Sequence, residues 1–66
     1  MSIKLIIRNE EHFLEPMKNL SVKKAMEHLD ILPEAYLAIR NGEILVEHEH
    51  LLDGDIIKFI PVISGG

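Results

Sequence analysis

Residues 56–66 read Ile-Ile-Lys-Phe-Ile-Pro-Val-Ile-Ser-Gly-Gly. Residues 56–62 form an apolar, strand-like run with hydrophobic side chains at both odd and even positions, as in a strand buried centrally in a sheet. The glycines that follow have no Cβ and favour a thin, flexible tail, which we place at about residues 62–66. Gly66 ends the sequence in a carboxylate that a narrow enzyme site could admit. We therefore predict a central strand, and a terminus that is itself the reactive group.

The residues before this strand predict a β-hairpin and a loop. Residues 36–40 and 43–46 are apolar runs separated by Asn41-Gly42, a strong signal for a two-residue hairpin turn. Leu51-Leu52 is expected to fill a gap under the following loop, and residues 53–55 (Asp-Gly-Asp) have the composition of a turn.

The N-terminal residues predict a second hairpin. Ile3, Leu5 and Ile7 alternate with other residues, which is the period of a strand with one buried face. Residues 9–12 are polar and are expected to turn the chain, so that residues 13–17 return as a short strand. Because Pro16 lacks an amide donor, this return strand should lie at a sheet edge or end there.

A helix is predicted between the two hairpins. Ser21 can cap its first turn, and an apolar stripe recurs at Val22, Ala25, Met26 and Leu29. Leu32-Pro33 should end any continuation. The expected fold is therefore α+β, with a mixed sheet of four to five strands and one covering helix.

Composition excludes several classes of function. The 66 residues fit one domain, and no stretch is long and apolar enough to span a membrane. A net charge of −4 argues against direct nucleic-acid binding. The chain has no cysteine, hence no disulfide, thiolate nucleophile or Cys-based metal site. Because the N-terminus lacks the pattern of a signal peptide, we expect a cytoplasmic location.

Side-chain chemistry is sparse. His48 and His50 alternate with glutamates and could share a face, but the ligands for a convincing metal site are absent. His12 and His28 are isolated, and no nucleophile–base set or phosphate loop is present. We therefore expect no bound metal, no bound cofactor and no catalytic activity of its own.

Three stretches together resemble a known family. Residues 38–43 (Ala-Ile-Arg-Asn-Gly-Glu), 51–55 (Leu-Leu-Asp-Gly-Asp) and 60–66 (Ile-Pro-Val-Ile-Ser-Gly-Gly) are similar, in order and spacing, to the MoaD/ThiS sulfur carriers. That family includes the small subunit of molybdopterin synthase and the thiamin-pathway carrier. The resemblance implies one ubiquitin-like β-grasp domain over residues 1–66.

The resemblance also implies a mechanism and partners. A ubiquitin-activating-type enzyme would use ATP to adenylate Gly66, and a sulfurtransferase or cysteine desulfurase would supply sulfur to form a thiocarboxylate. An acceptor synthase or a tRNA-thiolating enzyme would then receive the sulfur. Gly65 and Ser64 would belong to the tail that threads into the partner's active site. Ile63, Val62 and Phe59 would serve docking, with core packing as the competing role for Phe59.

Three questions stay open at this point. The sulfur acceptor could belong to molybdopterin, thiamin or thiolated-tRNA synthesis. The chain could instead be a ubiquitin-like modifier that is joined through Gly66 to lysines of target proteins. It could also be a plain binding module in which the two glycines are incidental.

Overall fold

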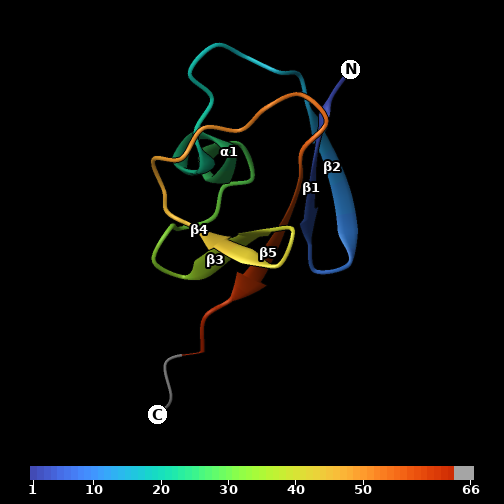
Figure 1. The fold of residues 1–66 in the computed structure, drawn as a ribbon. Coiled ribbons are helices and arrows are strands. Elements are labelled where there is room, and N and C mark those ends of the chain that lie inside the picture. Colours follow the sequence, from blue (N-terminus) through green and yellow to red (C-terminus); the bar gives the residue numbers. More distant parts are fainter. Residues whose placement is uncertain (64–66) are drawn as a thin grey trace.

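A computed structural model describes residues 1–63 and shows one helix against a five-stranded sheet (Figure 1). The elements are β1 (Ile3–Ile7), β2 (Glu10–Leu14), α1 (Val22–His28), β3 (Tyr36–Arg40), β4 (Glu43–Leu45) and β5 (Ile56–Pro61). The strand order in the sheet is β2-β1-β5-β3-β4. The predicted α+β class is confirmed, and the arrangement is that of a ubiquitin-like β-grasp fold. None of the helices in the described part is long and apolar enough to cross a membrane.

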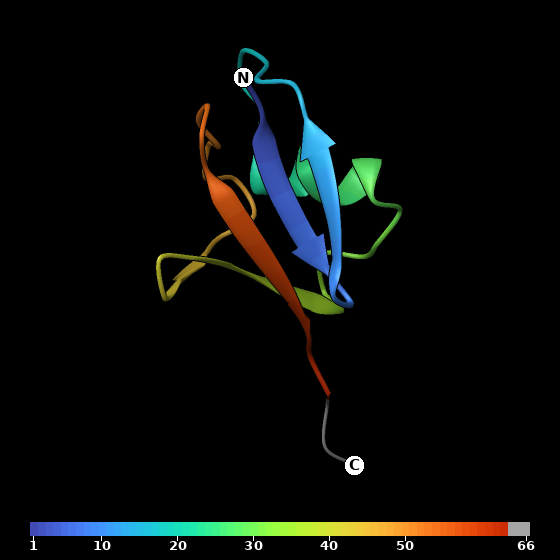
Figure 2. The same ribbon diagram turned by 90° about the vertical axis from the view of Figure 1, so that its right-hand side faces the viewer.

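The first and last strands form the middle of the sheet. β1 and β5 pair in parallel, with Leu5 beside Ile57 and Ile7 beside Phe59, whereas every other pairing is antiparallel. Figure 2 shows β1, β2 and β5 side by side, with α1 lying behind them. Strands from the two ends of the chain therefore depend on each other for their place in the sheet.

The core lies between the sheet and α1. Ile3, Leu5 and Ile7 point into it and are at most 5% exposed, as their alternation predicts. The buried hydrophobic residues are Ile3, Leu5, Ile7, Leu20, Val22, Ala25, Met26, Ala38, Leu45, Leu51, Ile57 and Phe59. Among residues 1–63 no polar or charged side chain is buried, so this core is entirely apolar.

The predicted bounds of the first hairpin are wrong. The turn is Arg8-Asn9, both with positive φ (52° and 65°), and the return strand begins at Glu10 and ends at Leu14. Because β2 is an edge strand with four of its five residues exposed, it shows no apolar alternation that would reveal it in the sequence. Pro16 lies beyond its end, where a missing amide costs no ladder hydrogen bond.

The predicted helix and its cap are confirmed. The Ser21 hydroxyl accepts a hydrogen bond from the Lys24 amide at 3.3 Å, and the residues of the stripe inside the helix are buried. The helix ends earlier than Leu32-Pro33, because Leu29 is the C-cap and Asp30 adopts a left-handed φ of 58°.

The second hairpin turns at Asn41-Gly42 as predicted, with φ values of 53° and 81°. Its return strand is one residue shorter than expected and ends at Leu45. In the loop that follows, Leu51 is buried, whereas Leu52 is 66% exposed. The prediction that both leucines fill a gap is therefore correct only for Leu51.

Arg40 holds this loop against β3. Its guanidinium donates to Asp55 Oδ2 at 3.0 Å and to the His50 carbonyl at 3.4 Å. The same Asp55 oxygen accepts the Leu52 amide at 2.8 Å. These bonds position the turn that leads into β5.

One feature of β5 corrects the sequence prediction. Its apolar residues on both faces indicated a strand buried on both sides, but only Ile57 and Phe59 face the core, while Ile56 is 54% and Ile60 is 37% exposed. The reason is that α1 covers one face of the sheet only. The other face remains open.

Candidate functional site

The open face of the sheet carries a mostly apolar surface with one lysine in its middle. Side chains of directly paired residues share a face, so the register places Ile44 beside Ile39 and Leu37 beside Ile60. Ile6 and Ile39 both flank Lys58, from opposite sides of β5. We call this surface the open sheet face and define it by Ile6, Leu37, Ile39, Ile44, Ile56, Lys58 and Ile60.

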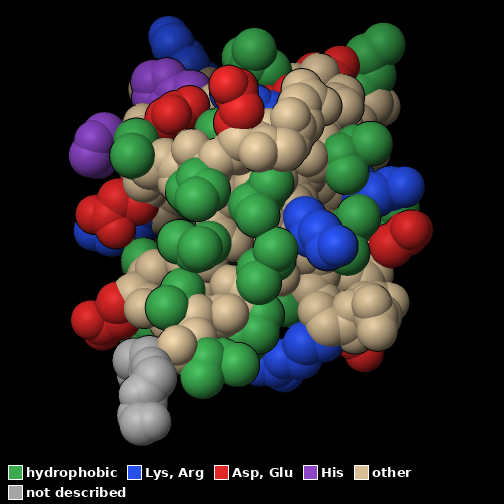
Figure 3. Space-filling model, turned by 60° about the horizontal axis from the view of Figure 1, so that its bottom comes forward, with side chains coloured by type: hydrophobic (Ala, Val, Ile, Leu, Met, Phe, Trp, Pro, Cys, Tyr) green, Lys and Arg blue, Asp and Glu red, His purple; other side chains and the backbone are tan. Residues whose placement is uncertain are grey.

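Figure 3 views the molecule from the side where β3, β4 and the end of β5 lie in Figure 1. Hydrophobic side chains gather across the middle of this view, histidine side chains lie toward one margin, and acidic side chains lie around the periphery. Ile44 alone is 62% exposed. Exposed apolar side chains gathered on one face make this surface the candidate site of protein interaction.

The C-terminal segment leaves the sheet next to this face. The Val62 amide donates to the Ala35 carbonyl at 2.8 Å, so the backbone is attached to the domain one residue beyond β5. Val62 is 44% exposed and Ile63 is 87% exposed. The predicted tail of about 62–66 thus includes one residue whose backbone is hydrogen-bonded to the body. Ser64, Gly65 and Gly66 lie outside the described residues.

Phe59 has a different environment from the other two predicted docking residues. It is 3% exposed and pairs with Ala38 on the core side of the sheet. Its side chain therefore packs in the core, and any contribution to docking comes from holding β5 in place. Val62 and Ile63 keep apolar surface that a partner can contact.

Positive charge lies beside the apolar surface. A shallow hollow of about 300 Å³ runs along one end of β5 and is lined by Ile6, Arg8, Asn9, Lys58, Phe59, Ile60 and Pro61. Arg8 donates a hydrogen bond to the Tyr36 hydroxyl at 3.0 Å, and this bond raises the pKa of Arg8 above its ordinary value. Two cations, Arg8 and Lys58, thus lie at this hollow in a chain whose net charge is −4.

The histidines do not converge. Over residues 1–63 no three His, Asp or Glu side chains are close enough together to hold a metal ion. His50 forms an isolated bridge with Ser21, and His12 lies 3.6 Å from Glu10 in another part of the fold. The described part of the chain therefore offers an exposed apolar surface rather than a cluster of metal-binding side chains.

Sequence reasoning missed most of the open sheet face. Ile6, Leu37, Ile39, Ile44 and Ile60 were not singled out, although their pattern was visible. Residues 3–7, 36–40 and 56–62 each carry apolar side chains at both parities. One short helix can cover only one face of the sheet. Strands with apolar residues at both odd and even positions could therefore have indicated that the other, uncovered face is apolar.

A family comparison agrees with this geometry. The model of the ThiS family matches residues 4–66, which is the whole chain except its first three residues. Proteins of this family are small sulfur carriers rather than catalysts, and they work with activating enzymes and synthases. The match includes both sheet edges, the helix and the segment that follows β5. The chain belongs to the ThiS family of sulfur carrier proteins.

Proposed function

We propose that this carrier transports sulfur as a thiocarboxylate on Gly66. The observation that carries the proposal is the position of the tail root. Within residues 1–63 the last backbone anchor, at Val62, lies next to an exposed apolar face, and Ile63 beyond it is 87% exposed. A partner that docks on the open sheet face thus meets the start of the segment that ends in Gly66.

The chemistry requires activation of the carboxylate. A carboxylate is a poor electrophile, so a partner enzyme transfers AMP from ATP to Gly66 and releases pyrophosphate. A sulfur nucleophile then attacks the acyl carbon, forms a C–S bond and expels AMP. With sulfide as donor the thiocarboxylate forms directly. With a protein persulfide the product is an acyl disulfide, and a thiol must reduce its S–S bond to release the thiocarboxylate.

The tail residues have separate roles in this proposal. Four residues follow the anchored Val62, and in extended form they span at most about 14 Å. Gly65 and Ser64 keep this segment narrow enough to enter a partner's site, since neither carries a bulky side chain. Val62 and Ile63, together with the open sheet face, supply the docking contacts. The chain itself binds neither ATP nor metal in this scheme.

The partners follow from the chemistry. An adenylating enzyme activates the terminus, a sulfurtransferase or cysteine desulfurase supplies the sulfur, and an acceptor enzyme consumes it. The candidate acceptor reactions are the synthesis of molybdopterin, of thiamin and of thiolated tRNA. Each of these reactions would consume the same thiocarboxylate.

The composition of the chain makes the proposal easy to test. The protein has no cysteine, so a thiol-selective alkylating reagent can label the carrier only at a thiocarboxylate that the reaction has formed. The carrier is incubated with ATP, an adenylating enzyme of the family and sulfide, then alkylated and digested with trypsin. We expect the label on the fragment 59–66.

Mass alone would be ambiguous for the intact protein. Exchange of oxygen for sulfur adds about 16 Da, as does oxidation of any of the three methionines. The fragment 59–66 contains no methionine and removes this ambiguity. A label that depends on ATP and appears on this fragment supports the proposal. ATP-dependent isopeptide adducts on lysines of other proteins, without any alkylated terminus, would instead identify a protein modifier.

A further inference from the structure

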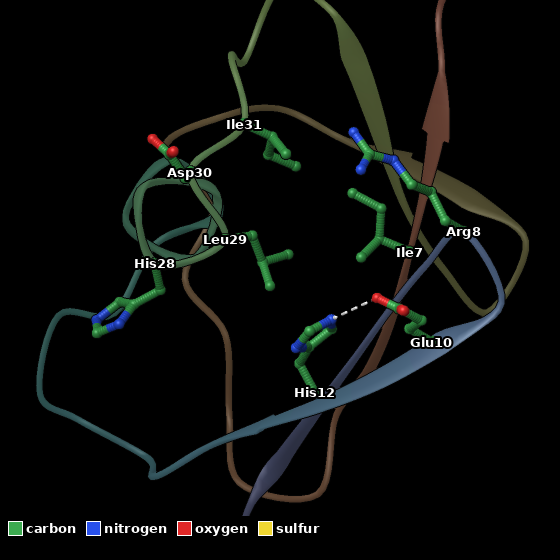
Figure 4. Close-up of a pocket in the computed structure, with 8 residues that line it drawn as sticks. All are labelled: Ile7, Arg8, Glu10, His12, His28, Leu29, Asp30 and Ile31. Carbon is green, nitrogen blue, oxygen red and sulfur yellow. Dashed lines mark ion pairs between the residues drawn. The ribbon is translucent and has the colours of Figure 1, made fainter.

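The free edge of β2 forms a groove with the C-terminal end of α1, on the side of the sheet that the helix covers and opposite the open sheet face. The groove has a volume of about 360 Å³ and is drawn in Figure 4. We call it the edge groove and define it by Ile7, Arg8, Glu10, His12, His28, Leu29, Asp30 and Ile31.

The floor of the edge groove is apolar and its margins are polar. In Figure 4 the side chains of Ile7, Leu29 and Ile31 point toward the middle of the groove, whereas His28 points away. Glu10 and His12 approach from β2, with 3.6 Å between His12 Nε2 and Glu10 Oε1. An apolar side chain inserted from the β2 side would therefore be received by three hydrophobic residues.

The backbone of β2 offers hydrogen bonds at the same edge. The Lys4 amide donates to the Asp55 carbonyl, toward β5, so Lys4 and its partner Phe13 are not a hydrogen-bonded pair of the β1–β2 ladder. In an antiparallel ladder such pairs alternate, so Glu11 is in the same position as Phe13. The amide and carbonyl groups of these two residues therefore point outward from the sheet.

The charge around this edge selects the partner. The edge groove is lined by two carboxylates, Glu10 and Asp30, and one cation, Arg8, which is hydrogen-bonded to Tyr36. Glu11, whose carboxylate lies 3.7 Å from the Lys4 ammonium, and Glu15 are on the same segment of chain, so acidic side chains still outnumber Lys4 and Arg8 around this edge. Pairing with a second copy would bring these acidic side chains together, whereas a basic segment would complement them.

We propose that the edge groove binds an extended segment of a partner protein in which apolar and basic residues alternate. The segment adds to the sheet as a strand beside β2, with apolar side chains on the helix side of the sheet, facing Ile7, Leu29 and Ile31, and basic side chains on the opposite side, where Glu11 lies. Main-chain hydrogen bonds to Glu11 and Phe13 supply affinity, and the groove supplies specificity. The apolar part of this site lies on the helix side of the sheet, opposite the open sheet face, and the proposal does not depend on the sulfur chemistry.

The test uses a defined probe, an acetylated and amidated octapeptide of alternating valine and lysine. The ¹⁵N-labelled full chain is titrated with it, and amide hydrogen exchange is followed residue by residue. We expect saturable binding and exchange slowed at least about tenfold at Glu11 and Phe13, whose amides gain partners. His12 and Leu14, already bonded to β1, should change little. A probe with a central valine and the adjacent lysine both replaced by proline should not bind, because in either strand direction one of the two lost amides belongs to the ladder.

Charge variants separate a specific site from general attraction. Glu10→Gln with Glu11→Gln should weaken binding of the valine–lysine probe at least about threefold at low salt. The matched control, Glu43→Gln with Asp53→Asn, makes the same change in net charge away from this edge and should leave binding unchanged. Equal weakening of probe binding in the two double variants would overturn the proposal. So would unchanged amide hydrogen exchange at Glu11 and Phe13 when the probe is added. Concentration-dependent protection of these amides without probe would do so too, by identifying a second copy as the occupant.

Discussion

Two neighbours on β4 provide a sharp test, because they lie on opposite faces of the sheet. Ile44 is 62% exposed on the open sheet face, whereas Leu45 is 8% exposed and belongs to the core. Ile44→Ala should change the free energy of unfolding by less than about 0.5 kcal/mol, as expected for a surface position. Leu45→Ala should cost about 2–3 kcal/mol, because it leaves a cavity.

The effect on adenylation by the partner enzyme should be the reverse, with Ile44→Ala the more damaging change. Fully burying an isoleucine contributes about 1.5–3 kcal/mol, and roughly two thirds of that remains available at an exposed fraction of 62%. Loss of about 1–2 kcal/mol of docking energy raises the KM for the carrier about 5- to 30-fold. Leu45→Ala, at a temperature where it is folded, should leave this KM nearly unchanged.

The assay is ATP-dependent labelling of the fragment 59–66, measured against carrier concentration with an adenylating enzyme of the family. Urea unfolding of both variants provides the stability values. An unchanged KM for Ile44→Ala would refute the assignment of the open sheet face as the docking surface. A large loss of stability in that variant would refute its placement outside the core.

Three further predictions concern stability and are measured by urea unfolding. Asp55→Ala removes the acceptor shared by Arg40 and the Leu52 amide and should cost about 1–3 kcal/mol, whereas exposed Asp53→Ala should be nearly neutral; equal losses would contradict the role of that turn. Ser21→Ala removes the helix cap and should cost about 0.5–1 kcal/mol, with Ser21→Thr retaining most of the stability. Gly42→Ala should cost about 1–2 kcal/mol from backbone strain alone, since φ is +81° and an added Cβ would meet nothing within 4 Å; a neutral result would mean that the turn changes its conformation freely.

The sequence predicted those elements whose local pattern and burial agree. Alternation at Ile3, Leu5 and Ile7 identified a core strand, and the helical stripe from Val22 to Leu29 identified the covering helix. Asn41-Gly42 identified a hairpin because the turn requires positive φ at both positions. In each case the local sequence pattern agrees with the burial or the backbone conformation that the residues have in the fold.

Predictions failed where long-range arrangement decides the environment. β2 is an exposed edge strand, so its residues carry no apolar pattern, and Arg8-Asn9 is a less familiar turn sequence than Asn-Gly. The apolar residues of β5 could not show from spacing alone that one sheet face lacks a cover. That information comes from the parallel pairing of β1 with β5 and from the single helix.

The most direct test of the central claim is to move the carboxylate off Gly66. One alanine is appended after Gly66, and the extended chain is compared with the original in the alkylation assay, with both folds checked by amide spectra. We predict full labelling of the original fragment 59–66 and none of the extended one, with docking on the open sheet face retained. Equal labelling of the extended chain, with the added alanine still attached, would contradict the account.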